Sequence, residues 1–357
     1  MTDSIAAEDR RAADGLALPQ ADARGTHLDA SRTPWGVHGA RFPGPLDRAV
    51  IAVTSRLPNS WLGLRLAIAL RRIVTRRMAG DDGLDVVLWG LRMRLHPRRN
   101  GCEKGALFTP QMYEAPERRE LTVEIDRSKT AGRPFVFIDI GANVGLFSLF
   151  VASRAGADAQ ILAIEPEPEN LRRLRFNIAS NPGIPIRVAA VALDEKSGRV
   201  AVETNFRDRG GARTRPLSRL PPLYPPPQEG EDFVDIPPPR AGEGREGAAG
   251  VVEVECLPLK ELLDRDGIRS IDALKIDIEG AEDRVLVPFF RDAPEALWPG
   301  FILIEDSSGE WRVDLFSFLA EHGYAVATRT KQNVMLRRES GTHRASFTDR
   351  ASPASCR

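Results

Sequence analysis

The sequence predicts an α/β fold with a mostly parallel sheet that is covered by helices on both faces. Short apolar segments alternate with segments of helical length from residue 135 to about residue 340. Such an alternation is typical of parallel strands joined by helical crossovers. Ligands of these sheets bind beyond the carboxyl ends of the strands, so the residues that follow each strand are the candidates for function.

The first predicted strand, 135–140, leads into the most informative motif of the chain. It is apolar on both alternations around Asp139, as expected of a strand that is covered on both faces. Gly141 and Gly145 permit a sharp turn and a close approach of the backbone to a ligand, and apolar spacing predicts a helix over 144–154. A strand, a turn and a helix in this order direct free backbone N–H groups at a bound cofactor.

The spacing of the motif indicates which cofactor this is. A dinucleotide-binding turn has the pattern Gly-x-Gly-x-x-Gly, whereas this chain has Asp139-x-Gly141-x-Asn143-x-Gly145. The observed pattern resembles the Asp-x-Gly-x-Gly-x-Gly turn of S-adenosylmethionine-dependent methyltransferases, with an asparagine in place of the middle glycine.

A second acid, Glu165, ends the predicted strand 160–165 and precedes a predicted helix at 167–180. A carboxylate in that place can accept hydrogen bonds from both hydroxyls of a ribose. Because nicotinamide-dependent enzymes use the same device, Glu165 indicates an adenosine-bearing ligand without choosing between the two cofactors. The alternative is an acidic residue that only favours the dipole of the following helix.

Three acids lie at or just beyond the end of the predicted strand 271–277: Asp277, Glu279 and Glu282. Acids at the end of a buried strand are costly unless they bind something. We expect Asp277 to face the positively charged methionyl or sulfonium part of the cofactor. We expect Glu279 to hold a substrate hydroxyl or to accept its proton. Alternatively, Glu279 and Glu282 only favour the dipole of a helix predicted at 280–290.

The N-terminal part of the chain is predicted to consist of a tail and an extension of the sheet domain. Residues 1–45 lack apolar periodicity and are expected to be a disordered tail, and residues 46–130 form the extension. Within it, residues 47–79 interleave apolar residues with seven arginines and predict two helices interrupted at a Pro-Asn pair. These helices suit either an anionic membrane surface or a helical cap with solvated arginines. A β-hairpin centred on a Trp-Gly pair is predicted over 84–98.

The remaining elements belong to a sheet domain predicted over residues 131–340. Further strands are predicted at 186–192 and 301–305, further helices at 258–265 and 312–322, and strand-like runs at 324–329 and 333–337. Residues 207–250 contain three proline clusters and a glycine-rich run, which predicts a disordered insertion in a surface loop. The flanking runs 198–204 and 251–256 could pair as antiparallel strands. Residues 341–357 are predicted to be a disordered tail.

Composition excludes several classes of protein. The chain has 357 residues, and its 50 basic and 50 acidic side chains cancel, so there is no bulk attraction to nucleic acid. The polar N-terminus is not expected to be a secretory signal peptide, and Asp139 and Asn143 interrupt the longest apolar stretch, which is therefore not expected to be a membrane span. Isolated cysteines (Cys102, Cys256 and Cys356) indicate no metal or redox motif, and a reducing cytoplasm is expected.

Four segments in order give a specific resemblance: 137–148, 164–171, 191–198 and 274–282. Together they resemble the FkbM family of methyltransferases over about residues 135–337, with weaker traces at 100–110 and 113–117. The resemblance implies a class I methyltransferase fold, a Rossmann-like, mostly parallel seven-stranded sheet whose last strand runs antiparallel. It also implies S-adenosylmethionine as cofactor, and methyl transfer to a hydroxyl of a sugar, a glycan or a secondary metabolite.

Carried over position by position, the resemblance implies a cofactor site and a catalytic pair. Glu165 would bind the ribose hydroxyls. The cofactor turn would consist of Asp139, Gly141, Asn143 and Gly145, and the adenine edge would be lined by Ala192, Leu193 and Asp194. Asp277 and Glu279 would border the methyl donor, and Glu279 is the first candidate for the base that takes the proton of the acceptor hydroxyl. Glu305 and His322 are the fallback bases. No spacing demands a metal, although Asp277, Glu279 and Glu305 could supply oxygen ligands.

Two other classes of protein are the competing interpretations. A nicotinamide-dependent oxidoreductase is disfavoured by the missing middle glycine and by the acids Asp277 and Glu279. A non-enzymatic interaction protein on the same fold would use the helices of 47–79 and the segment 207–250 as its working surfaces.

Overall fold

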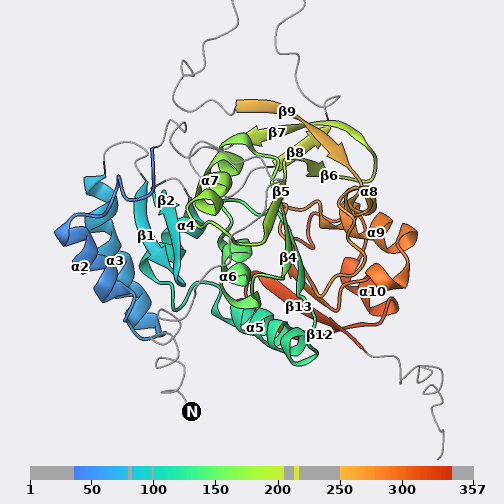
Figure 1. The fold of residues 1–357 in the computed structure, drawn as a ribbon, viewed down its shortest axis with the longest axis horizontal. Helices are drawn as coiled ribbons and strands as arrows, with labels where there is room; N and C mark the ends of the chain where they lie inside the picture. Colours follow the sequence, from blue (N-terminus) through green and yellow to red (C-terminus); the bar gives the residue numbers. More distant parts are fainter. Residues whose placement is uncertain (1–35, 79–82, 99, 205–212, 217–249, 340–357) are drawn as a thin grey trace, which may run out of the picture.

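The computed structural model describes residues 36–78, 83–98, 100–204, 213–216 and 250–339. At its centre lies a seven-stranded sheet in the order β12-β13-β11-β10-β3-β4-β5 (Figure 1). The strands are β3 (Val136–Ile140), β4 (Gln160–Ile164), β5 (Ile186–Ala189), β10 (Ala273–Ile276), β11 (Phe301–Glu305), β12 (Tyr324–Arg329) and β13 (Asn333–Arg338). All neighbouring pairs are parallel except those of β13, which is antiparallel to both β11 and β12. The predicted mostly parallel sheet with an antiparallel last strand is confirmed.

Helices cover both faces of this sheet, as the apolar side chains on both alternations of β3, the neighbour of the central strand β10, require. Val136, Ile138 and Ile140 of β3 pack in one core cluster with α8 (Leu259–Arg265), α9 (Glu282–Asp292) and α10 (Leu315–Glu321). Phe137 points the other way and packs with Phe150 of α6 (Leu146–Ala155) and with α5 (Ala115–Thr130). Asp139 lies on this second face and is fully buried. α7 (Pro168–Ala179) connects β4 to β5, so the predicted alternation of strands and helices is confirmed.

The N-terminal extension packs against the sheet domain. It consists of α2 (Pro45–Thr54), α3 (Trp61–Arg77), β1 (Leu84–Leu88), β2 (Leu91–Leu95), α4 (Gly101–Phe108) and α5. The two predicted helices and the predicted hairpin are confirmed, and Trp89 and Gly90 at its tip both have positive φ, as a tight two-residue hairpin turn requires. Met93 and Leu95 share a core cluster with Leu146 of α6, which ties the hairpin to the sheet domain.

The described part of the predicted N-terminal tail, residues 36–45, ends at the first residue of α2 and is tied to the hairpin. The backbone N–H groups of Gly39 and Arg41 donate to Asp85, which also forms a buried ion pair with Arg94 at 2.7 Å. A buried carboxylate needs such donors, and this is why the chain before α2 is held in place. The rest of that tail and the predicted tail 341–357, which includes Cys356, lie outside the described residues.

A small second sheet flanks the predicted insertion. It has the order β6-β9-β7-β8, formed by β6 (Ala192–Leu193), β7 (Gly198–Thr204), β8 (Arg213–Pro216) and β9 (Gly250–Leu257). The antiparallel pairing of β7 with β9 confirms the pairing considered for the two flanks. Apart from β8 and Gly250, residues 207–250 lie outside the described residues. Among the described helices, none has both the length and the apolar character needed to cross a bilayer.

Candidate active site

The turn between β3 and α6 can be built only with glycine at its first position. Gly141 has a φ of 75°, and a Cβ placed there would lie 1.9 Å from the backbone oxygen of Asp277. Asn143 (φ 53°) and Gly145 (φ 88°) are also left-handed, and a Cβ at Gly145 would lie 2.5 Å from Leu174. The turn therefore presses close to the segment after β10, which brings the ends of these two strands together.

Asp139 is held by the first turn of α6 and by a lysine of the neighbouring strand. Its Oδ2 accepts hydrogen bonds from the backbone N–H (3.0 Å) and the hydroxyl (2.6 Å) of Ser148. Its Oδ1 accepts no hydrogen bond within the described structure and lies 3.9 Å from Lys275 Nζ. Burial raises the pKa of Asp139, and the Lys275 charge opposes that rise. Asp139 thus presents one oxygen of a buried carboxylate to the space beyond the strand.

Lys275 is a site residue that the sequence interpretation did not single out. It lies in the middle of β10 and is 6% exposed. Its Nζ is 3.3 Å from Asp277 Oδ2. Burial alone would lower the pKa of Lys275, but the carboxylates of Asp277 and Asp139 outweigh burial and hold that pKa above its ordinary value. The available signal was a lysine inside an otherwise apolar strand, where an unpaired charge is too costly to be buried.

Glu165 lies where the predicted ribose-binding carboxylate should be. It follows β4 and is 4% exposed. Its Oε2 accepts from the backbone N–H of Asn143 at 2.7 Å, and its Oε1 accepts from that of Glu167 at 2.9 Å. Burial raises the pKa of Glu165 to about 7, although both backbone hydrogen bonds oppose the rise. Each oxygen keeps a lone pair for a ligand hydroxyl.

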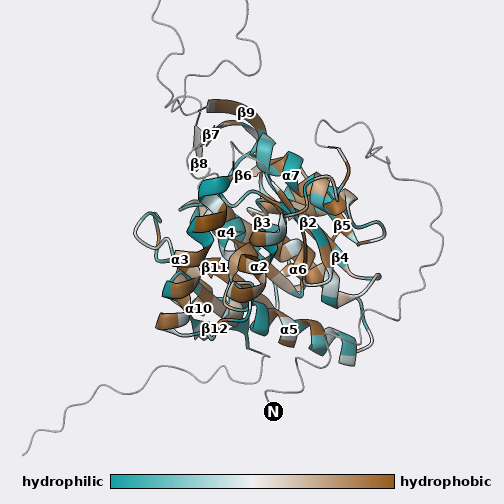
Figure 2. Ribbon diagram, turned by 90° about the vertical axis from the view of Figure 1, so that its left-hand side faces the viewer, coloured by the Kyte–Doolittle hydropathy of each residue, from teal (hydrophilic) through white to brown (hydrophobic). Residues whose placement is uncertain are grey.

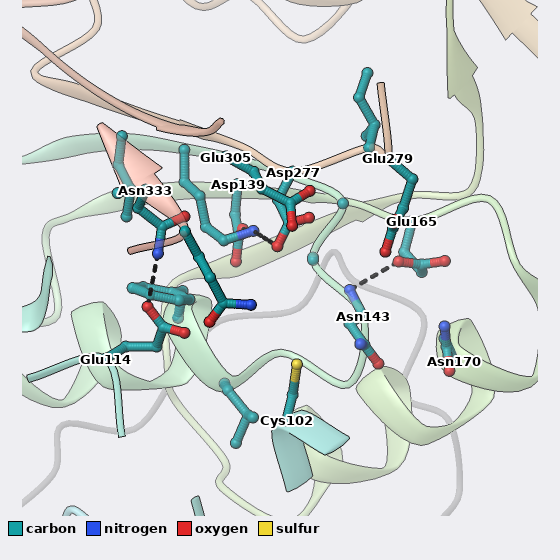
Figure 3. A pocket seen from close by; sticks show the side chains of 18 of the residues that line it. Cys102, Glu114, Asp139, Asn143, Glu165, Asn170, Asp277, Glu279, Glu305 and Asn333 are labelled. Atoms are coloured by element: carbon teal, nitrogen blue, oxygen red, sulfur yellow. Dashed lines mark hydrogen bonds and ion pairs between the residues drawn. The ribbon is translucent and has the colours of Figure 1, made fainter. Parts of the chain in front are cut away.

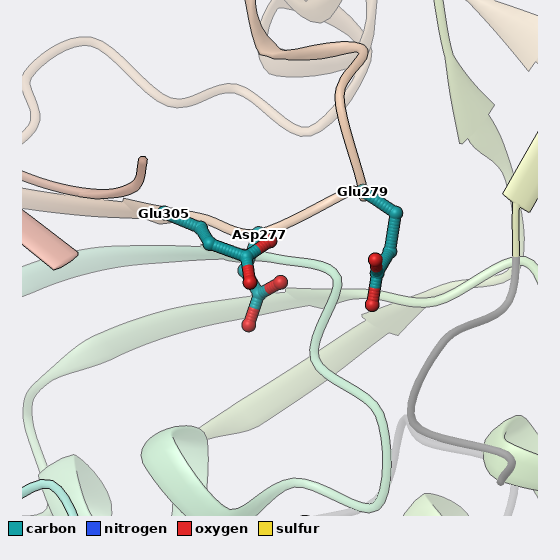
Figure 4. A group of neighbouring side chains, drawn as sticks. All are labelled: Asp277, Glu279 and Glu305. Carbon is teal, nitrogen blue, oxygen red and sulfur yellow. The ribbon is translucent and has the colours of Figure 1, made fainter. Parts of the chain in front are cut away.

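Asp277, Glu279 and Glu305 form a carboxylate cluster (Figure 4). One oxygen of each lies within 4.8 Å of the others, an arrangement that could also supply oxygens to a cation. Burial, and then the neighbouring charge of Asp277, raises the pKa of Glu305 to about 8. Glu279 has a φ of 58°, so its backbone is held in a conformation that side chains rarely adopt. Glu282 is absent from the cavity lining and instead accepts hydrogen bonds from Ile278, Gly280 and Trp311.

These strand-end acids border one cavity of about 720 Å³ (Figure 3). Asp139, Glu165 and Asp277 come from the ends of three adjacent strands, β3, β4 and β10 respectively, and all line it. We call the part of the cavity near the glycine turn the turn end; its lining residues are Gly141, Ala142, Asn143, Glu165, Pro166 and Asn170. The sequence prediction that these acids converge on one hollow is confirmed.

The opposite part of the cavity, which we call the extension end, was missed by the sequence interpretation. Its lining residues are Cys102, Tyr113, Glu114, Gln332 and Asn333. Asn333 donates to Glu114 Oε2 at 2.8 Å and to Glu117 Oε1 at 3.0 Å. Burial and the neighbouring Glu117 raise the pKa of Glu114 to about 7, and Glu114 has a φ of 45°. The only signal was the weak family trace at 113–117.

Five residues proposed from the sequence do not line the cavity: Gly145, Ala192, Leu193, Asp194 and His322. Asp194 faces α9, where it pairs with Arg284, whose Nε donates to Asp194 Oδ1 at 2.9 Å. His322 lies against the rings of Phe318 and Phe290, and its Nδ1 is 2.7 Å from the backbone oxygen of Phe318. Neither residue lines the cavity, whereas the other fallback base, Glu305, does.

The sheet order, with a glycine turn and acids at the carboxyl ends of its central strands, is that of a class I methyltransferase fold. The FkbM methyltransferase domain matches residues 139–326, more than half of the 357 residues. The chain belongs to the FkbM family of methyltransferases.

The chain is similar to several individual proteins. The chain is 32% identical to methyltransferase sdnD of Sordaria araneosa over 45% of its own length and 62% of that protein, which is less than two thirds of it. It is 28% identical to the 31-O-demethyl-FK506 methyltransferase FkbM of Streptomyces tacrolimicus, over 54% of this chain and 73% of that one. A solved S-adenosylmethionine-dependent methyltransferase from Agrobacterium tumefaciens aligns over 74% of this chain and 72% of its own, at 12% identity and a TM-score of 0.36.

Proposed function

We propose that this protein is an S-adenosylmethionine-dependent methyltransferase that methylates a hydroxyl group of a sugar, a glycan or a secondary metabolite. One observation carries the proposal: Asp139, Glu165 and Asp277, from three adjacent strands, border a single cavity that the glycine turn also lines. Family membership favours methyl transfer over the alternative of a nicotinamide-dependent oxidoreductase.

The residues at the turn end fit this cofactor. Glu165 has one free acceptor position on each oxygen for the two ribose hydroxyls, because each oxygen accepts only one backbone N–H in the described structure. Asp139 Oδ1 faces the cavity and accepts no hydrogen bond from the described residues, and Asp277 lies beside it. Carboxylates suit the ammonium and sulfonium charges of S-adenosylmethionine. When bound, this cofactor supplies an activated methyl group.

A hydroxyl acceptor needs a group that takes its proton. A carboxylate does this best when its pKa lies near the working pH. Glu279 is the first candidate, and Glu305 shares its cluster with a pKa raised to about 8. An oxygen acceptor is also supported by the Streptomyces relative, whose name specifies a 31-O-demethyl substrate. The chain's part in the reaction is to hold the acceptor oxygen in line with the methyl group and to receive its proton.

The proposed function is tested by incubating the purified full chain with S-adenosylmethionine labelled in its methyl group and a cell extract or a panel of hydroxylated compounds. We expect mass spectrometry to find the label on an oxygen of the product. Glu279→Gln should lower the rate about 10²–10⁴-fold, the usual contribution of a positioned base, while the exposed Glu321→Gln should not. Label found only on nitrogen, carbon or sulfur would contradict the proposed acceptor class.

A further inference from the structure

Helix α3 has two apolar stripes, and only one of them is covered by the described protein. Gly63, Ala67, Leu70 and Val74 follow a spacing of four, three and four residues, and this stripe is buried or partly buried where α3 meets α2 and the core behind it. Leu62, Leu66, Ala69 and Ile73 repeat the same spacing one position earlier. All four are exposed, although a helix that only packs on its own protein needs a single stripe.

Exposed apolar side chains also lie in the first turn of α3 and on the neighbouring α2. Trp61 and Leu62, in the first turn of α3, are 70% and 69% exposed. Leu46 and Val53 of the neighbouring α2 are 45% and 51% exposed. Figure 2 faces this side of the molecule, with α2 and α3 toward the viewer. An exposed apolar area that spans two helices is typical of an interaction site.

The charge beside this area has one sign. α3 contains five arginines and no acidic residue in its 17 residues, and Asp47 is the only acid in α2. Arg65, Arg72 and Arg76 recur at spacings of seven and four, so they form a row along α3 next to the exposed stripe. The Arg65 guanidinium lies 4.5 Å from the centre of the Trp61 ring. Because the whole chain has no net charge, this row is a local concentration of positive charge.

We propose that α2 and α3 form a docking surface, defined by Leu46, Val53 and the exposed residues of α3, for a bilayer that contains anionic lipids. Apolar residues and a tryptophan beside a row of arginines are the features of helices that lie in the plane of a membrane interface. The arginines would bind lipid phosphates while the exposed stripe enters the acyl boundary. Nucleic acid would leave the exposed leucines without an apolar partner. A second copy of the chain would place two rows of like-charged arginines against each other.

The docking surface is fixed to the body of the protein, so it would bind as a preformed unit. Gln111 donates from Nε2 to the backbone oxygens of Thr54 (3.0 Å) and Leu57 (2.9 Å), at the carboxyl end of α2. Gln111 lies between α4 and Tyr113, and both of these contribute to the lining of the extension end.

Co-sedimentation of the full chain with vesicles tests the docking surface. We expect binding to phosphatidylcholine vesicles that contain phosphatidylglycerol, little binding to phosphatidylcholine alone, and weakening by salt because the attraction is screened. Arg65→Glu/Arg72→Glu should lower the vesicle partition coefficient by at least about tenfold. Leu62→Ser/Ile73→Ser should lower it by a similar factor. The matched control Val326→Ser/Lys331→Glu changes an exposed apolar and a basic residue of the far hairpin and should bind as the unaltered protein does.

Because the altered side chains are exposed, the variants are expected to unfold at the same temperature as the unaltered protein, which circular dichroism checks. Failure of the unaltered protein to bind anionic vesicles at low salt would overturn the proposal, as would binding by both variants that equals binding by the unaltered protein. Light scattering that shows a dimer broken by Leu62→Ser/Ile73→Ser, without vesicle binding, would assign the surface to a second copy and overturn it too. None of these outcomes depends on methyl transfer.

Discussion

The two ends of the cavity are built in different ways. The turn end comes from short continuous segments, the loops after β3 and β4, whose conformation is set locally by glycine and by backbone hydrogen bonds. The extension end joins segments that are far apart in the chain: the Asn333 amide contacts Glu114 across 219 positions. The first end is therefore fixed within the sheet domain. The second depends on the packing of the extension against the last hairpin, and we expect it to be the surface that selects the acceptor.

Gly141→Val should have the largest effect of the variants, and this effect should be on cofactor binding at the turn end of the cavity. The new Cβ would meet the Asp277 backbone oxygen at 1.9 Å, and valine disfavours a φ of 75°. We expect S-adenosylhomocysteine affinity to fall more than about 100-fold by calorimetry, with a lower unfolding temperature. Gly183→Ala is the matched control, because Gly183 has a φ of 87° but a Cβ placed there would meet no atom of the described residues within 4 Å. It should cost about 1 kcal/mol and leave affinity unchanged. Equal losses in both variants would contradict the close approach of the turn to β10.

Lys275→Met changes a residue between the two ends of the cavity and should lower the free energy of unfolding of the protein. Removing the Lys275 charge leaves Asp139 buried without a cation, and breaking a buried pair in this way typically costs about 3–5 kcal/mol. Lys260→Met removes a partly exposed pair with Asp264 and should cost less than about 0.5 kcal/mol. Urea unfolding measures both. If the two variants lose the same stability, Lys275 does not balance the acids.

Glu114→Gln should affect the extension end of the cavity and leave the turn end unchanged. Once labelling has identified an acceptor, we expect kcat/KM for that acceptor to fall about 10–100-fold, the range of a lost hydrogen bond to a charged group. Affinity for S-adenosylhomocysteine should stay within about twofold, since Glu114 lies at the extension end. Glu321→Gln serves as the control. A parallel loss of cofactor affinity would show that the ends are not independent.

The smallest expected effect is a pH dependence at the turn end. Ribose hydroxyls donate to the ionised form of Glu165, whose pKa in the free protein is raised to about 7. Affinity should therefore be full above that pKa and lost below it, by about tenfold between pH 8 and pH 6. Titration of S-adenosylhomocysteine at several pH values measures this, and Glu165→Gln should remove the dependence. An affinity that rises as the pH falls would contradict the role of the ionised carboxylate.

The same contrast explains what the sequence could predict. The central strands and the first turn were predicted correctly, because apolar periodicity and glycine spacing are local signals. For the same reason, the acids Asp139, Glu165 and Asp277 were predicted correctly to line one cavity. Glu114 and Asn333 were missed, since nothing in a single sequence brings together two segments so far apart.

Asp194 shows a further reason why position alone is insufficient. The family resemblance assigned it to the adenine edge, but Arg284 of α9 holds its carboxylate away from the cavity lining. A long-range ion-pair partner is not visible in sequence spacing. The role of Asp194 toward the cofactor stays a prediction.

The central claim is that one cavity, bordered by three neighbouring strand ends, binds an adenosine cofactor. Isothermal titration of S-adenosylhomocysteine tests it most directly, with the unaltered chain, Glu165→Ala and the exposed control Glu321→Ala. We expect saturable binding to the unaltered chain and to the control, and a loss of about 10–100-fold in Glu165→Ala, in line with hydrogen bonds to a charged group. No binding to the unaltered chain, or equal affinity in all three proteins, would contradict the account.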